Sequence, residues 1–78
     1  MIYVIASSEP VYVYWCHDRG INPRDRTKVR RIREQRDTMG LRAQEGDEFH
    51  VVLIDEPTHR DTYRLIQEMH RCGFREED

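Results

Sequence analysis

Two groups of polar side chains follow the most apolar segments of this 78-residue chain, and both are of types that could bind a ligand or take part in catalysis. The residues are Ser7, Ser8, Glu9, Asp55, Glu56 and His59. If the two apolar segments are strands of an open parallel sheet, these side chains lie beyond the carboxyl ends of the strands, where such sheets bind ligands. The pattern predicts a ligand crevice between the first and the last strand.

The second group extends an apolar run, so that residues 51–56 read VVLIDE. This segment resembles the Walker B strand of ATPases, helicases and phage terminases. The resemblance implies that Asp55 and Glu56 serve a metal ion and the attacking water. However, the first strand leads into ASSEP at residues 6–10, not into a glycine-rich loop that ends in lysine. The alternative is that the acidic pair only begins a helix, where carboxylates stabilise the positive end of the dipole.

A second candidate site is the strongly basic middle of the chain. Residues 19–42 hold nine basic and three acidic side chains, a net charge of +6, whereas residues 43–78 carry a net charge of −6. This asymmetry predicts a negatively charged partner: nucleic acid, an acidic protein surface or the opposite end of a second copy. The expected contact residues are Arg24, Arg26, Lys28, Arg30, Arg31, Arg33 and Arg36. The alternative is that these residues form only a solvated edge strand. A sequence pI near 6.1 argues against nucleic acid as the partner.

Aromatic residues form a third candidate surface. Tyr12, Tyr14 and Trp15 cannot all face a sheet from one helix, so we expect at least one of them to be exposed. Tyr12 and Trp15 are the candidate anchors for a partner protein or a second copy. The alternative is a wide buried stripe with one incidental surface tyrosine.

The cysteines and histidines do not have the spacing of a metal site. Cys16 and His17, like His70 and Cys72, lack the C-x-x-C or H-x-x-x-H pattern that directs two ligands at one ion. We therefore expect no metal, no cofactor and two reduced, buried cysteines. A cysteine nucleophile with a histidine base is equally unsupported, because no neighbouring sequence suggests an oxyanion hole. The missing catalytic motif and the segregated charge favour a non-enzymatic protein.

The elements that position these residues are predicted from hydrophobic patterns and from three glycines, each followed by an apolar residue. Strands are expected at 2–6, 27–33 and 49–54, and helices at 9–19, 34–39 and 58–72, the last beginning with a Thr58/Asp61 capping box. Gly20, Gly40 and Gly73 are expected to end the helices in left-handed conformation, with Ile21 placed against Cys16 as in a Schellman motif. Two alternatives stay open: a hairpin strand at 11–16 and one basic helix over 23–39.

The alternation of strands and helices predicts one Rossmann-like α/β domain, residues 1–78, in which 75–78 fray. Right-handed crossovers give a three-stranded parallel sheet in the order 2-1-3. The first strand is expected in the centre and the charged second strand at an edge. The near-continuous apolar third strand is expected to be buried on both faces.

The stretches MIYVIA at 1–6 and YWCHDRG at 14–20 resemble small Rossmann-like proteins of actinobacteriophages, whose function is unknown. The resemblance implies a viral accessory protein without established catalytic residues. The chain has 12 arginines and one lysine, a ratio that is typical of a GC-rich coding sequence such as those of actinobacteriophages. Since no basic leader or long apolar run is present, we expect a cytoplasmic protein, in the host cell if viral, with no membrane contact.

These observations favour a non-enzymatic protein that binds a host or phage macromolecule, most directly a protein. A separate hypothesis is self-association through the aromatic helix or an edge strand. One alternative is a degenerate nucleotide-binding or hydrolytic domain that uses the acidic pair after the third strand. Another is nucleic-acid binding through residues 19–42.

Overall fold

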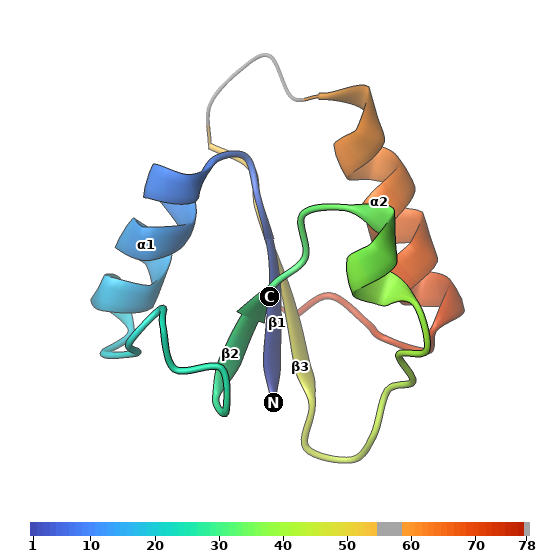
Figure 1. Cartoon of the computed structure of the whole chain (residues 1–78), viewed down its shortest axis with the longest axis horizontal. Helices are drawn as coiled ribbons and strands as arrows, with labels where there is room; N and C mark the ends of the chain where they lie inside the picture. Colours follow the sequence, from blue (N-terminus) through green and yellow to red (C-terminus); the bar gives the residue numbers. More distant parts are fainter. Residues whose placement is uncertain (55–58, 78) are drawn as a thin grey trace.

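The computed structural model describes residues 1–54 and 59–77, in which strands alternate with helices (Figure 1). The elements are β1 (Ile2–Ala6), α1 (Glu9–Asp18), β2 (Val29–Arg31), the 3-10 helix η1 (Gln35–Thr38), β3 (Glu48–Val52) and α2 (Arg60–Arg71). All three strands are parallel and their order is β2-β1-β3. The predicted fold is confirmed, and both alternatives, the hairpin strand and the long basic helix, are wrong.

β1 is the central strand, and its neighbours are the two edges of the sheet. Ile2 pairs with Val29 on one side and with Glu48 on the other. The β-branched and aromatic residues of β1 suit this position, because a central strand is covered on both faces. Its residues from Tyr3 to Ala6 are at most 9% exposed.

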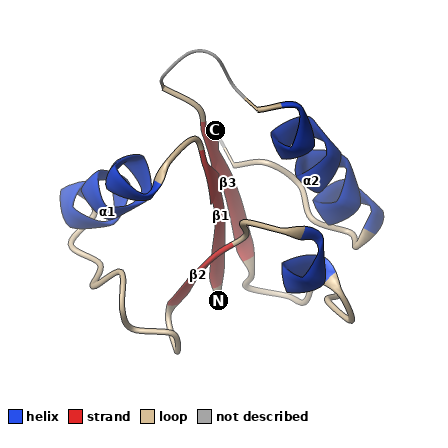
Figure 2. Cartoon of the chain, turned by 45° about the horizontal axis from the view of Figure 1, so that its top comes forward, coloured by secondary structure: helices blue, strands red, loops and turns tan. Residues whose placement is uncertain are grey.

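The two α-helices lie on opposite sides of the sheet (Figure 2), and side chains that alternate along the strands form a separate core on each face. On one face α1 contributes Val11, Tyr12 and Cys16, which pack with Val4, Ala6 and Val29. On the other face α2 contributes Leu65 and Met69, which pack with Tyr3, Ile5, Ile32, Phe49 and Phe74. Within the described residues, no helix is long and apolar enough to cross a membrane.

The two α-helices end as the sequence predicts. At the end of α1 the Gly20 N–H donates to the His17 carbonyl (3.1 Å) and the Ile21 N–H to the Cys16 carbonyl (2.8 Å), which is the Schellman pattern. Gly20 has a φ of +69°. α2 ends with the same two bonds around Gly73.

Gly40 belongs to a different structure. η1 is a single turn, shorter than the predicted helix over 34–39. The Leu41 N–H donates to the Thr38 carbonyl (3.2 Å), with Met39 at φ −67° and ψ 126° and Gly40 at φ +76°. This is a type II turn, in which glycine is needed because of its positive φ.

Three predictions about the last third of the chain are wrong. β3 is not buried on both faces along its predicted length, because it is an edge strand and Ile54 beyond its end is 64% exposed. The tail does not fray at Glu76 and Glu77, since Glu76 pairs in parallel with Phe49 and the Glu77 N–H donates to the Phe49 carbonyl (2.7 Å). Cys72 is only partly buried, although Cys16 is fully buried as expected.

Candidate binding groove at the β2 edge

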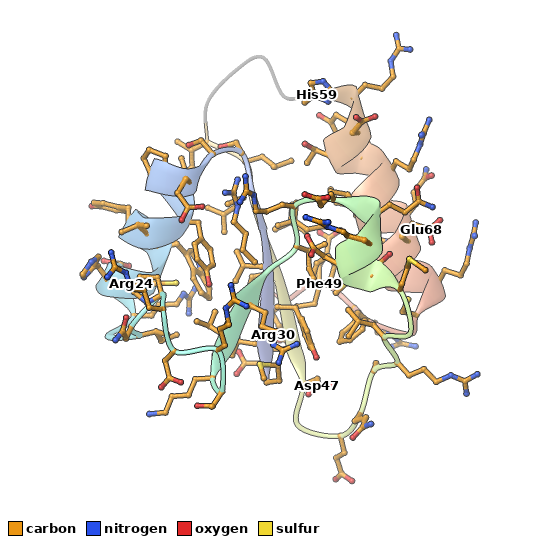
Figure 3. The ribbon with its side chains drawn as sticks, in the orientation of Figure 1. Arg24, Arg30, Asp47, Phe49, His59 and Glu68 are labelled. Carbon is orange, nitrogen blue, oxygen red and sulfur yellow. The ribbon has the colours of Figure 1, made fainter. Side chains whose placement is uncertain are left out.

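The predicted crevice between β1 and β3 is described only in part, because Asp55, Glu56 and Thr58 lie outside the described residues. The structure places His59 at the start of α2 (Figure 3). Its Nδ1 accepts a hydrogen bond from the Asp61 N–H (3.1 Å), so His59 is the N-cap where a Thr58/Asp61 capping box was predicted. This ring nitrogen therefore stabilises a helix end.

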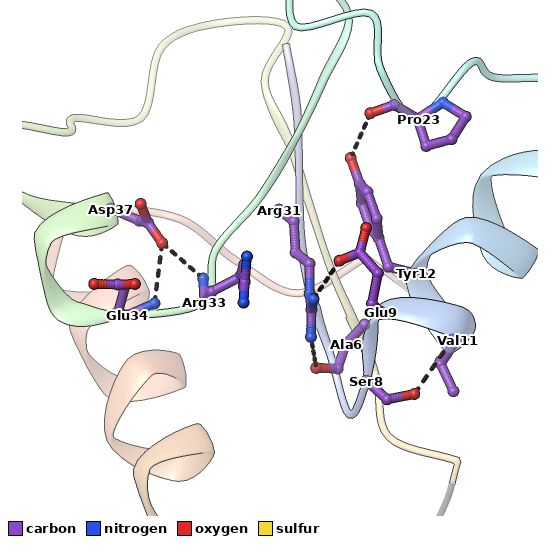
Figure 4. A network of polar contacts seen from close by, with 10 residues as sticks. All are labelled: Ala6, Ser8, Glu9, Val11, Tyr12, Pro23, Arg31, Arg33, Glu34 and Asp37. Atoms are coloured by element: carbon purple, nitrogen blue, oxygen red, sulfur yellow. Dashed lines mark hydrogen bonds and ion pairs between the residues drawn. The ribbon is translucent and has the colours of Figure 1, made fainter.

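The residues at the end of β1 are turned toward α1 and β2. Ser8 is the N-cap of α1, and its Oγ accepts from the Val11 N–H (3.4 Å). The Ser7 Oγ is buried without a hydrogen-bond partner among the described residues. The Glu9 carboxylate forms an ion pair with Arg31 of β2 at 2.5 Å (Figure 4). Glu9 is thus paired on the β2 side of β1, whereas the predicted crevice lies on the β3 side.

A groove of about 670 Å³ lies along β2 and the residues that follow it. Five of the seven predicted basic residues line this groove: Arg26, Arg30, Arg31, Arg33 and Arg36. Its acidic residues are Glu9, Glu34 and Asp37. Arg24 and Lys28 are outside the lining, and Arg24 lies beside α1, apart from Arg30 (Figure 3).

The turn before β2 sets the register of this edge. The Asp25 carboxylate accepts from the Thr27 N–H (3.1 Å) and from the Thr27 hydroxyl (2.5 Å). These hydrogen bonds lower the pKa of Asp25, because they favour its charged form. Val29 is then buried on the α1 face, which sends Arg30 to the opposite face and Arg31 back toward α1.

Two of the five arginines already have partners within the chain. The Arg31 side chain is 14% exposed; besides its ion pair with Glu9, its Nη2 donates to the Ala6 carbonyl (3.4 Å). Its Nε is buried without a partner among the described residues. Arg36 pairs through Nε with Glu34 (2.8 Å) at the surface. These two guanidiniums therefore contribute little free positive charge.

Arg26, Arg30 and Arg33 are exposed, and within the part of the chain that is described they make no ion pair with a carboxylate. The Asp37 carboxylate, which is close to Arg33, accepts instead from the backbone N–H groups of Arg33 (2.9 Å) and Glu34 (3.0 Å) (Figure 4). These two hydrogen bonds fix the conformation of the loop between β2 and η1. The groove therefore presents three exposed guanidiniums that have no carboxylate partner among the described residues.

A buried tyrosine lines the groove on each face of the sheet, Tyr3 on the α2 face and Tyr12 on the α1 face. Tyr3 is 9% and Tyr12 4% exposed. The Tyr12 hydroxyl donates to the Pro23 carbonyl (3.5 Å), and burial raises the pKa of Tyr12 to about 12. Burial also raises the pKa of Tyr3, which nearby Arg30 partly opposes. Neither ring is free to stack on a base, and Tyr12 is a core residue rather than an exposed anchor.

The exposed aromatic residue of α1 is Tyr14, at 71%. Trp15 is partly buried and packs on the His50 ring (4.8 Å between centroids), with the Arg19 guanidinium 4.5 Å from the Trp15 centroid. Trp15 is thus already engaged by its own chain, on the β3 side of α1. The structure does not bring the two candidate aromatic anchors together with the arginines into one exposed surface.

Sequence reasoning missed the apolar residues that complete the groove, Met39 and Leu41. Met39 is 75% exposed because the type II turn at Gly40 carries it outward. The sequence feature that marks this turn is Gly40, for which the sequence pattern predicts a helix end instead. Among the described residues, no three His, Cys, Asp or Glu side chains are arranged to hold a metal ion. Comparison with protein families, curated proteins and solved structures finds no match to this chain.

Proposed function

We propose that this chain is a non-enzymatic binding protein, of the kind that acts as a host- or phage-directed accessory, and that it holds an acidic segment of another protein in the groove at the β2 edge. The observation that carries the proposal is the set of three exposed guanidiniums, Arg26, Arg30 and Arg33, beside one groove. Guanidiniums form strong, often bidentate hydrogen bonds with carboxylates. An acidic segment supplies the carboxylates that these groups lack.

The backbone of β2 supports an extended ligand. The Lys28 carbonyl accepts a hydrogen bond from the Ile2 N–H, and the Ile32 N–H donates to the Val4 carbonyl, so the backbone groups of Lys28 and Ile32 face β1. Alternation along the strand leaves the N–H and C=O of Arg31 facing away from β1. A peptide strand can add to such an edge, with backbone bonds for affinity and side-chain contacts for specificity.

The composition of the groove favours protein over nucleic acid. Glu9, Glu34 and Asp37 interrupt the positive charge, so the groove suits carboxylates at separate positions better than a continuous phosphate backbone. The two tyrosines are buried, whereas single-strand binding proteins use exposed aromatic rings to stack bases. The apolar surface of exposed Met39 suits an apolar side chain of a peptide.

Binding is favoured over catalysis because, among the described residues, no histidine or cysteine lines the groove. Arginine remains protonated at every physiological pH and is a poor general base. The acidic pair Asp55 and Glu56, on which the nucleotide-hydrolysis alternative depends, lies outside the described residues.

The test is a titration of the protein with two fluorescent probes of matched charge, an extended peptide rich in glutamate and an oligonucleotide. We expect the peptide to bind, with an affinity that falls as salt rises. Arg30→Glu/Arg33→Glu removes two charge-assisted contacts, so it should weaken peptide binding about 100-fold or more.

The matched control is Arg60→Glu/Arg71→Glu, which changes net charge equally on α2, away from the groove. It should retain binding within about threefold, since exposed charges this far apart are screened. Equal losses in the two variants would show that net charge alone drives binding and would contradict the proposal. Binding of the oligonucleotide in preference to the peptide would reassign the groove to nucleic acid.

A further inference from the structure

The two edges of the sheet carry opposite charge. At the β2 edge lie the exposed guanidiniums of Arg26, Arg30 and Arg33. At the β3 edge lies the acidic tail, whose Glu76 pairs in parallel with Phe49 and whose Glu77 is exposed. In the sequence, residues 19–42 carry a net charge of +6 and residues 43–78 a net charge of −6.

The tail is held in strand-like form at the outside of the sheet. The Glu77 N–H donates to the Phe49 carbonyl (2.7 Å), and the Glu76 carboxylate lies 3.3 Å from Nε2 of His70. Since the Glu77 N–H faces β3, alternation leaves the N–H and C=O of Glu76 facing outward. The β3 edge therefore offers both acidic side chains and free backbone groups.

We propose that the occupant of the groove is the acidic tail of a second copy of this chain, so that molecules associate head to tail with the tail beside β2. The proposal rests on the function proposed above and names its partner. Charge complementarity selects this arrangement, because pairing β2 with β2, or tail with tail, about a twofold axis would place like charges opposite each other. All strands are parallel, so the two different edges can pair in parallel without reversing either molecule.

Such a contact is heterologous, so in a dimer one molecule keeps a free β2 edge and the other keeps a free β3 edge. Association should therefore continue beyond the dimer as concentration rises. It should also weaken strongly at about 1 M NaCl, where the Debye length is about 3 Å. Both properties distinguish it from a closed apolar dimer.

The experiment is light scattering of the full chain across a concentration series, at low and at high salt. We expect the mean mass to rise with concentration at low salt and to return to the monomer at high salt. Arg30→Glu/Arg33→Glu and, separately, Glu76→Lys/Glu77→Lys should each remain monomeric under the same conditions. Glu77→Lys alone provides a second tail variant that leaves the contact between Glu76 and His70 intact and should also remain monomeric.

Mixing the two double variants provides the decisive arm. The acidic groove of the first variant can then pair with the basic tail of the second, and the unchanged tail of the first with the unchanged groove of the second. The mixture should therefore reach the mean mass of the wild type, which neither variant reaches alone. Wild-type protein that stays monomeric at low salt, or variants that associate as wild type does, would overturn the proposal. If the wild type is monomeric yet its groove still binds the glutamate peptide, self-association fails while the proposed function stands.

Discussion

The two edges of this small sheet solve the problem of unpaired strand backbone in different ways. β3 has five residues, contains the fully buried Phe49 and is covered in part by the chain's own tail. β2 has three residues and is bordered by arginines whose guanidiniums reach solvent. Charge and shortness discourage indiscriminate strand pairing. The β3 edge therefore contributes to the core of the fold, whereas the β2 edge carries the groove that we propose as the binding site.

The largest effect should come from Phe49→Ala at the β3 edge. Phe49 is 1% exposed and packs with Phe74 and His70, so its removal leaves a cavity and should lower the free energy of unfolding by about 3–5 kcal/mol. Urea denaturation measures this change. A loss below about 1 kcal/mol would show that the β3 edge does not carry the core.

A pH effect of smaller size should come from Tyr12, which lines the groove on the α1 face of the sheet. Since the pKa of Tyr12 is about 12 in the folded chain and near 10 when unfolded, its contribution is complete below pH 10 and is lost as the pH rises toward 12. The loss amounts to at most about 3 kcal/mol. In alkaline denaturation, Tyr12→Phe should therefore show a shallower decline than the wild type. The exposed Tyr14→Phe is the control and should decline as the wild type does; identical slopes in all three proteins would refute the assignment.

Replacing the glycine after each α-helix with alanine should lower the free energy of unfolding by different amounts at the two helix ends. Gly73 has a φ of +96°, which is farther from the left-handed helical value of about +57° than the φ of +69° at Gly20. Gly73→Ala should cost about 1–2 kcal/mol and Gly20→Ala about 1 kcal/mol. Thermal denaturation gives the ranking, and a larger loss at Gly20 would contradict it.

The smallest effect on stability should come from Arg30→Ala. Because Arg30 is exposed and makes no ion pair within the described residues, its removal should change the free energy of unfolding by less than about 0.5 kcal/mol. The same variant should weaken binding of the glutamate peptide. A destabilised Arg30→Ala protein would instead assign the β2 edge a structural role.

The fold could be predicted because its signals are local. β1 is apolar throughout, and the glycines after α1 and α2 require positive φ, which fixes where those helices end. The length of β2 and the tail's contact with Phe49 depend on which strand becomes an edge. Such long-range pairing leaves no local pattern in the sequence.

The candidate site could be predicted in part. Charge counting located the basic segment, and five of its seven named residues line one groove. It could not show that Glu9 pairs with Arg31 across 22 positions, or that Glu34 pairs with Arg36. Pairing decides which guanidiniums are free, and it depends on the tertiary structure.

The most direct test of the binding claim is a nuclear magnetic resonance titration of the labelled chain with the glutamate peptide at low salt. We expect backbone shift changes at residues 26–33 and 39–41, which border the groove, and little change at residues 50–54 beside the β3 edge. Changes confined to the β3 edge, or spread evenly over the molecule, would contradict the assignment of binding to β2.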